Sequence, residues 1–274
     1  MRSQLTKEIS DEEVAAFERD GVVCLRNVFD DTWIRRMREA ADAVLSRKSE
    51  LLELTEGGGR LSVSQFLWMR DDTFQDYLFK SPAAALGARL LRASRVSVLY
   101  DEFIVKEPGT PVPVSWHQDG PSWPIRGAQA LTLWMPLDST TVHSGGMRYA
   151  KGLHRGKVYS AYINTAGNAP GVTGIDGERC PDFDTMAEDV EILSWDVEPG
   201  DCLAHHMHMP HMTGPNQAKD MRRRAHTTRW IGEQCTFREG NFQIQRAWVE
   251  KPGVKEGEPV ISNHFPQVPF HKGW

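Results

Sequence analysis

Cysteine is scarce in this sequence, and its spacing does not suit bridging. The four cysteines, Cys24, Cys180, Cys202 and Cys235, form no C-x-x-C pair. Their spacing argues against a disulfide framework or a zinc ribbon and favours reduced thiols in the cytoplasm. The chain also lacks an apolar run of about 18 residues, and its first residues, MRSQLTKEISDEE, lack the apolar segment of an export signal. We therefore expect a soluble protein with no membrane contact.

A strong charge of one sign is missing as well. The 37 acidic and 32 basic residues are spread along the chain and leave a net charge of -5. The one dense basic cluster, residues 222–224, is too short to form a nucleic-acid-binding patch by itself. Nucleic acid is therefore not an expected partner, and a small-molecule substrate is. The sequence leaves the oligomeric state open.

The distribution of apolar residues predicts one domain over residues 1–274, mostly β with flanking N-terminal helices. Ser10 and Glu13 form a capping-box pair before a first helix, and further helices are predicted over 31–47 and 82–93. From about residue 96, short runs rich in Val, Ile, Thr and aromatics alternate with turn residues, which is typical of a sandwich or jelly roll. We expect a helical layer over about 10–95 and a β core over about 96–250. Residues 164–185 are expected to form a long loop.

A possible metal site begins at His117-x-Asp119. Residues i and i+2 of a strand share a face, so this imidazole and carboxylate can point at one ion, although the pair could also be a polar turn. A third ligand is available in the histidine-rich stretch DCLAHHMHMPHMTGPN, which offers His205, His206, His208 and His211. Two histidines and one carboxylate with open positions are typical of non-haem Fe(II) oxygenases.

The order of motifs resembles that of the phytanoyl-CoA dioxygenase family, the Fe(II)- and 2-oxoglutarate-dependent oxygenases with a double-stranded β-helix (jelly-roll, cupin-like) fold. The matching stretches are WHQD at 116–119, LTLWMPLD at 131–138, SGGMRYAKGLH at 144–154, PGD at 199–201 and HMTGPN at 211–216. The opening DEEVAAFERDGVVCLRNVF is also similar. The resemblance implies Fe(II), 2-oxoglutarate and O₂ as cofactor and co-substrates, with His117, Asp119 and His211 as the iron ligands.

The resemblance also implies residues for 2-oxoglutarate. The family has an arginine about eleven residues after the distal histidine, a position that Arg222 occupies. Strand parity favours Arg223 instead, because loop length can vary while the alternation of a strand is kept. Thr213 is expected to donate its hydroxyl to the same carboxylate, Trp134 to pack along the co-substrate, and Tyr100 to lie near one of its ends.

The substrate itself is not identified by the sequence. Trp116, Trp123, Lys106 and Arg126 are the candidate contacts. His205, His206 and His208 are expected mainly to fill strand positions, with the alternative that at least one of them points into the cavity near the metal. Related halogenases have a small residue where this chain has Asp119, so the carboxylate favours hydroxylation or another oxidation. Two alternatives remain: a cupin-like hydrolase or isomerase that binds metal through His206, His208 and His211, and a non-catalytic β-sandwich binding module.

Overall fold

A computed structural model describes residues 7–160, 177–186, 189–240 and 252–270 of the chain. Helix α1 (Asp11–Asp20) begins with the predicted capping box, in which the Glu13 backbone N–H donates to Ser10 Oγ and the Ser10 N–H donates to Glu13 Oε2. Helices α2 (Asp31–Ser46) and α4 (Ala83–Leu90) confirm the other two predicted helices. Helix α3 (Asp72–Lys80) was not predicted.

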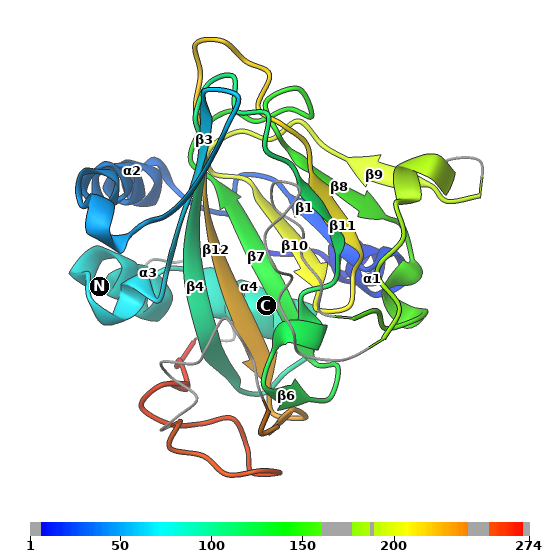
Figure 1. Cartoon of the computed structure of the whole chain (residues 1–274). Coiled ribbons are helices and arrows are strands. Elements are labelled where there is room, and N and C mark those ends of the chain that lie inside the picture. The colour runs from blue at the N-terminus through cyan, green and yellow to red at the C-terminus, as the bar shows by residue number, and fades with distance from the viewer. Residues whose placement is uncertain (1–6, 161–176, 187–188, 241–251, 271–274) are drawn as a thin grey trace.

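Two antiparallel sheets face each other beyond the helices (Figure 1). The major sheet has the order β1-β10-β7-β12-β4-β3-β2, and the minor sheet has the order β5-β11-β8-β9. The major-sheet strands are β1 (Val22–Leu25), β10 (Cys202–His206), β7 (Ala130–Pro136), β12 (Arg223–Gly232), β4 (Val96–Lys106), β3 (Gly59–Gln65) and β2 (Leu52–Glu56). The minor-sheet strands are β5 (Val114–His117), β11 (His211–Thr213), β8 (Met147–Ala150) and β9 (Ile192–Ser194). A separate ladder pairs β6 (Ile125–Arg126) with β13 (Thr236–Phe237). This arrangement is the predicted double-stranded β-helix.

The expected helical layer over 10–95 also contains strands. Besides β1, which the sequence indicates, a hairpin of β2 and β3 extends the major sheet beyond β4. Gly57 and Gly58 form its turn with positive φ angles, a backbone conformation that favours glycine. Of the expected loop over 164–185, residues up to 176 lie outside the described residues, and the rest includes the short helix η5 (Phe183–Met186). No helix in the described ranges is both long and apolar enough to cross a membrane.

The alternation of side chains along the central strands separates the core from the site. On β7, Leu131, Leu133 and Met135 belong to the apolar cluster that the N-terminal helices form against the outer face of the major sheet. Thr132 and Trp134 lie between them in the sequence and therefore face the minor sheet. The space between the two sheets is consequently lined by the inward residues of β4, β7, β10 and β12.

Candidate metal centre and co-substrate site

Two neighbouring strands and the turn after one of them bring the three predicted metal ligands together. His117 is the last residue of β5, His211 is the first residue of β11, and the two are direct cross-strand partners. Asp119 follows at the start of the 3-10 helix η3 (Gly120–Ser122). Its Oδ1 lies 3.8 Å from His117 Nε2 and 3.9 Å from His211 Nε2. Among the described residues, these three form the group whose ligand atoms converge within 4.8 Å of one another.

Backbone carbonyls orient both imidazoles. His117 Nδ1 lies 2.8 Å from the carbonyl of Ser115, and His211 Nδ1 lies 2.8 Å from the carbonyl of Met209. A carbonyl can accept a hydrogen bond and cannot donate one, so each Nδ1 carries the proton. Each Nε2 therefore presents a lone pair toward Asp119, as a metal-binding histidine must.

The carboxylate of Asp119 is oriented by a neighbour on the major sheet. Thr132 Oγ1 donates a hydrogen bond of 2.7 Å to Oδ2, which leaves Oδ1 facing the two histidines. Burial acts to raise the pKa of Asp119, but His205, His211 and Arg229 outweigh it and hold this pKa well below the usual range. Burial, with His117 and His205 nearby, lowers the pKa of His211 well below its usual value. The neutral imidazole and the ionised carboxylate are the forms that bind a metal ion.

Gly120 lets the turn that carries Asp119 lie against the segment before His211. Its backbone N–H donates to the Met207 carbonyl at 2.8 Å, and a Cβ at this position would stand 2.5 Å from Met207 Cε. A side chain at this position would have to displace the ends of the Met207 and His208 side chains. The backbone hydrogen bond holds the turn after Asp119 to the segment that precedes His211.

His205 also points into the site, contrary to the expectation that it fills an ordinary strand position. It is buried on β10 opposite Thr132, with Nε2 3.5 Å from Asp119 Oδ2 and Nδ1 3.3 Å from the Tyr149 hydroxyl. The sequence offered two adjacent histidines, of which a strand can direct one inward. His206 lies on the other face, where its Nε2 is 2.8 Å from the Ala128 carbonyl.

Buried cationic groups lie near the far end of the same space. Arg223, the first residue of β12, is 1% exposed, and its Nε and Nη1 have no hydrogen-bond partner in the described part of the chain. Its guanidinium lies 5.8 Å from the centre of the Trp134 ring. Burial lowers the pKa of Arg223 to about 10, so the group remains charged at neutral pH. The buried guanidinium of Arg223 therefore has two unpaired hydrogen-bond donors, and a carboxylate is a suitable acceptor for such a group.

Lys106 lies beside Arg223 rather than at a surface where a substrate could reach it. The two residues are cross-strand partners on β4 and β12, and Lys106 is completely buried. Its ammonium donates to Thr213 Oγ1 at 2.9 Å, to the Thr213 carbonyl at 3.4 Å and to the Gly214 carbonyl. The predicted substrate contact of Lys106 therefore needs correction, because strand pairing places this side chain with the predicted 2-oxoglutarate residues.

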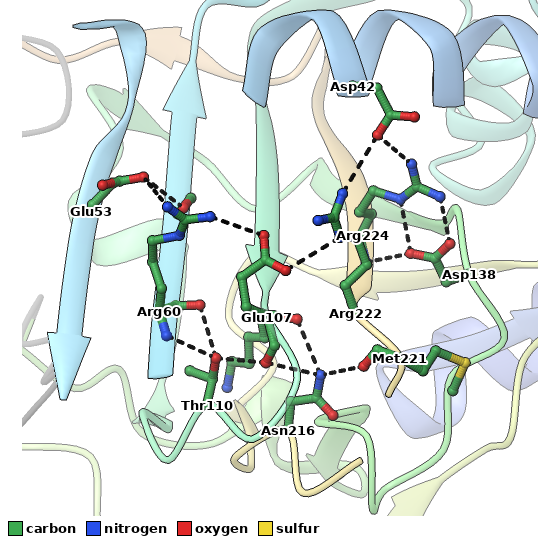
Figure 2. Close-up of polar contacts among 12 residues, drawn as sticks. Asp42, Glu53, Arg60, Glu107, Thr110, Asp138, Asn216, Met221, Arg222 and Arg224 are labelled. Atoms are coloured by element: carbon green, nitrogen blue, oxygen red, sulfur yellow. Dashed lines mark hydrogen bonds and ion pairs between the residues drawn. The ribbon is translucent and has the colours of Figure 1, made fainter. Parts of the chain in front are cut away.

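Arg222 takes the opposite position. Its side chain is 42% exposed and pairs with Glu107 and Asp42 on the surface. In the close-up of this surface (Figure 2), Arg222 and Arg224 both point toward Asp42 on α2, and Arg224 also binds Asp138. Arg223 is thus the arginine that a ligand between the sheets could reach. Its neighbours Arg222 and Arg224 form ion pairs on the outside of the sheet.

Asn216, the last residue of the HMTGPN motif, fastens the loop that leads to β12. Its amide donates to the carbonyls of Glu107 and Met221 (Figure 2) and to that of Lys106. Its Oδ1 accepts from the Ala218 N–H. The loop between Thr213 and Arg223 is consequently held to the end of β4.

Tyr100 lies away from Arg223, its pKa is raised by burial and by the nearby carboxylate of Asp119, and its place near one end of 2-oxoglutarate stays a prediction. It is six residues before Lys106 on β4, roughly 20 Å along an extended strand, and so does not share the far end with Arg223. Its ring lies 4.4 Å beneath the Arg229 guanidinium and 5.5 Å from Phe66. Trp123 is fully buried in the same apolar cluster.

Two of the proposed substrate contacts face away from the metal-ligand group. Trp116 precedes His117 on β5, so its side chain points to the other face of the minor sheet, where it packs against Phe183 at 5.3 Å. Arg126 is exposed and pairs with Glu256 at 2.9 Å. Trp116 therefore does not face the space between the sheets, whereas a substrate contact of Arg126 stays a prediction.

The fold and this group of side chains define a class of protein: a double-stranded β-helix with a buried His-Asp-His metal-binding group. The sequence also identifies the family to which the chain belongs. The sequence profile of the phytanoyl-CoA dioxygenase family matches residues 17–225, and the chain belongs to that family.

Individual relatives are more distant. A probable alpha-ketoglutarate-dependent hypophosphite dioxygenase of Stutzerimonas stutzeri is 30% identical over 126 residues, which span 46% of this chain and 42% of that protein. Among solved structures, the carbocyclase SnoK from nogalamycin biosynthesis aligns with a TM-score of 0.76 and 21% identity, over 97% of this chain and 99% of SnoK. EctD from S. alaskensis, solved with 2-oxoglutarate and 5-hydroxyectoine, aligns with a TM-score of 0.69 and 19% identity, over 95% of this chain and 90% of EctD. These two structures support the fold.

Proposed function

We propose that this chain is a non-haem Fe(II)- and 2-oxoglutarate-dependent dioxygenase that hydroxylates or otherwise oxidises a small-molecule metabolite. The observation that carries the proposal is the pairing of two features in one space between the sheets. His117, Asp119 and His211 offer ligand atoms to one ion, and Arg223 offers unpartnered donors to a carboxylate beyond them. Family membership supports the same reading.

In this proposal His117 Nε2, Asp119 Oδ1 and His211 Nε2 would hold Fe(II). Bound Fe(II) supplies the centre at which 2-oxoglutarate and O₂ react to give succinate, CO₂ and oxidised substrate. Arg223 and Thr213 would hold the far carboxylate of 2-oxoglutarate, with the Trp134 ring beside Arg223. Thr132 keeps Asp119 oriented, and the buried surroundings keep water from the reacting groups.

Three further assignments belong to this proposal. The carboxylate of Asp119 fills the ligand position that a halide would need, which favours oxygenation. The cytoplasm is the proposed location, because all four cysteines are free thiols in the structure. We also propose that residues 1–274 act as one catalytic unit, since the N-terminal helices pack on the sheet that carries Thr132 and Trp134.

The cupin-like hydrolase is less well supported. It requires His206, His208 and His211 to converge, whereas the Nε2 of His206 bonds the Ala128 carbonyl and its Nδ1 accepts from the His208 backbone N–H. A non-catalytic module with incidental histidines would not explain why Arg223 has buried donors without a hydrogen-bond acceptor.

A test uses the protein loaded with Fe(II) and supplied with 2-oxoglutarate and O₂. We expect succinate to be released, at a rate that rises when the right compound from a panel of small metabolites is added. Asp119→Ala should release none under the same conditions. Failure of the wild-type protein to bind Fe(II), or succinate release that does not change in Asp119→Ala, would contradict the proposed function.

A further inference from the structure

Lys106 and Arg223 are two buried basic groups without an acidic partner in the described part of the chain, and burial beside Arg223 lowers the pKa of Lys106 well below its usual value. Both are almost wholly inaccessible, and they lie opposite each other on β4 and β12. In the part of the chain that the structure describes, neither forms an ion pair with a carboxylate. Asp138 is the carboxylate whose charge acts on the pKa of Arg223, but it forms its ion pair with Arg224. Burying two like charges is costly, and a bound anion offsets that cost.

The hydrogen bonds of Lys106 determine what Thr213 can do. An ammonium group has three protons and no lone pair, so Lys106 must be the donor to Thr213 Oγ1. Its other contacts are the carbonyls of Thr213 and Gly214, which also accept. Because the oxygen of Thr213 already accepts from Lys106, the hydroxyl proton is free to point toward another acceptor.

We propose that Lys106 is a positioning residue for the distal carboxylate of 2-oxoglutarate, which it holds through Thr213. The inference rests on the proposed function and deepens it. Lys106 does not reach the carboxylate itself, since its donors are occupied. It turns the Thr213 hydroxyl into a dedicated donor, so that Thr213 and Arg223 supply three donors to the two carboxylate oxygens.

A specificity for dicarboxylic 2-oxo acids follows. 2-Oxopentanoate has the same chain length and keto-acid end as 2-oxoglutarate, but a methyl group replaces its distal carboxylate. It would leave the donors of Arg223 unpaired and Thr213 without an acceptor, and unsatisfied charged donors are strongly unfavourable. Lys106 should therefore contribute to the binding of 2-oxoglutarate and nothing to the binding of 2-oxopentanoate.

The test measures binding to the Mn(II)-loaded full chain by calorimetry, with 2-oxopentanoate followed by competition where its binding is weak. Lys106→Met keeps the length of the side chain and removes the charge. We expect its affinity for 2-oxoglutarate to fall about 10- to 100-fold, the usual range for losing a charge-assisted contact. Affinity for 2-oxopentanoate and for Mn(II) should stay within about 2-fold. Lys151→Met, at an exposed lysine paired with Glu191, is the matched control and should match the wild type.

Substitutions of Thr213 test the pathway independently of Lys106. Thr213→Val should lose most of the same 2-oxoglutarate affinity, Thr213→Ser should recover it, and Lys106→Met should add little in the Thr213→Val background. Should Lys106→Met not fold, the Val and Ser pair still decides the role of the hydroxyl. Unchanged 2-oxoglutarate affinity in Lys106→Met, or an equal loss for both acids, would overturn this inference alone. A wild-type protein that binds no 2-oxoglutarate would overturn the proposed function instead.

Discussion

The two faces of the major sheet have opposite chemistry although they share the same strands. On the outer face of β7, Leu131, Leu133 and Met135 pack against helices in a purely apolar cluster. On its inner face Thr132 bonds a metal-ligand candidate and Trp134 lies beside Arg223. The outer face stabilises the fold, whereas the inner face holds polar groups whose burial is unfavourable unless a ligand completes them. Substitutions at neighbouring positions should therefore separate stability from binding.

The largest effect is expected at the metal ligands. Asp119→Ala removes the one anionic ligand and leaves two neutral imidazoles, so Fe(II) binding and succinate formation should fall below detection. Metal content after gel filtration and succinate release measure the two losses. Normal metal content in this variant would mean that the metal is held elsewhere.

On the outer face, Leu133→Ala should affect the fold rather than the site. Leu133 is 1% exposed, and truncating a buried leucine costs about 2–5 kcal/mol of unfolding free energy. Urea unfolding measures this cost, and calorimetry should show an unchanged metal affinity in the variant that remains folded. A weakened metal affinity with unchanged stability would contradict the division between the two faces.

Thr132→Val is the inner-face counterpart, one residue away and nearly the same shape. The variant loses the hydrogen bond to Asp119 Oδ2, and such losses typically weaken metal binding about 10- to 100-fold. Its unfolding free energy should change by about 1–3 kcal/mol, because Asp119 Oδ2 loses a hydrogen-bond donor while no large cavity forms. Equal metal affinity in Thr132→Val and the wild type would show that Asp119 is oriented by something else.

The smallest effect is a dependence of stability on pH. Burial, with His208 and His154 nearby, lowers the pKa of His206 from 6.5 to about 3. Between these values the unfolded chain binds more protons than the folded chain, so the metal-free protein should lose stability as the pH falls through this window. His206→Asn should show a shallower slope in urea unfolding at fixed pH values. Parallel slopes in the two proteins would exclude this contribution.

Much of the fold and the site could be predicted from the sequence where a local pattern carries the information. The capping box at Ser10, the strand runs after residue 96 and the H-x-D motif are patterns of this kind. Strand parity also favoured Arg223 over Arg222, and the structure places Arg223 between the sheets. The β2–β3 hairpin was missed although a glycine turn separates its two alternating runs.

Other features depend on pairing between distant strands. Lys106 looks like a surface residue in the sequence, because lysine is rarely buried, and pairing with Arg223 reverses that expectation. Which of His205 and His206 faces inward depends on the register of β10 against β7. Trp116 is different, since its place next to His117 on one strand already predicted the opposite face.

The most direct test of the account is an anaerobic titration of 2-oxoglutarate into the Fe(II)-loaded protein, followed by its weak visible metal-to-ligand band. Arg223→Met and Arg222→Met form a matched pair, because they remove neighbouring guanidinium groups, one buried and one exposed. We expect the wild type and Arg222→Met to give the band at similar 2-oxoglutarate concentrations, and Arg223→Met to need about 100-fold more. A band that is absent from the wild type, or equal requirements in the two variants, would contradict the account.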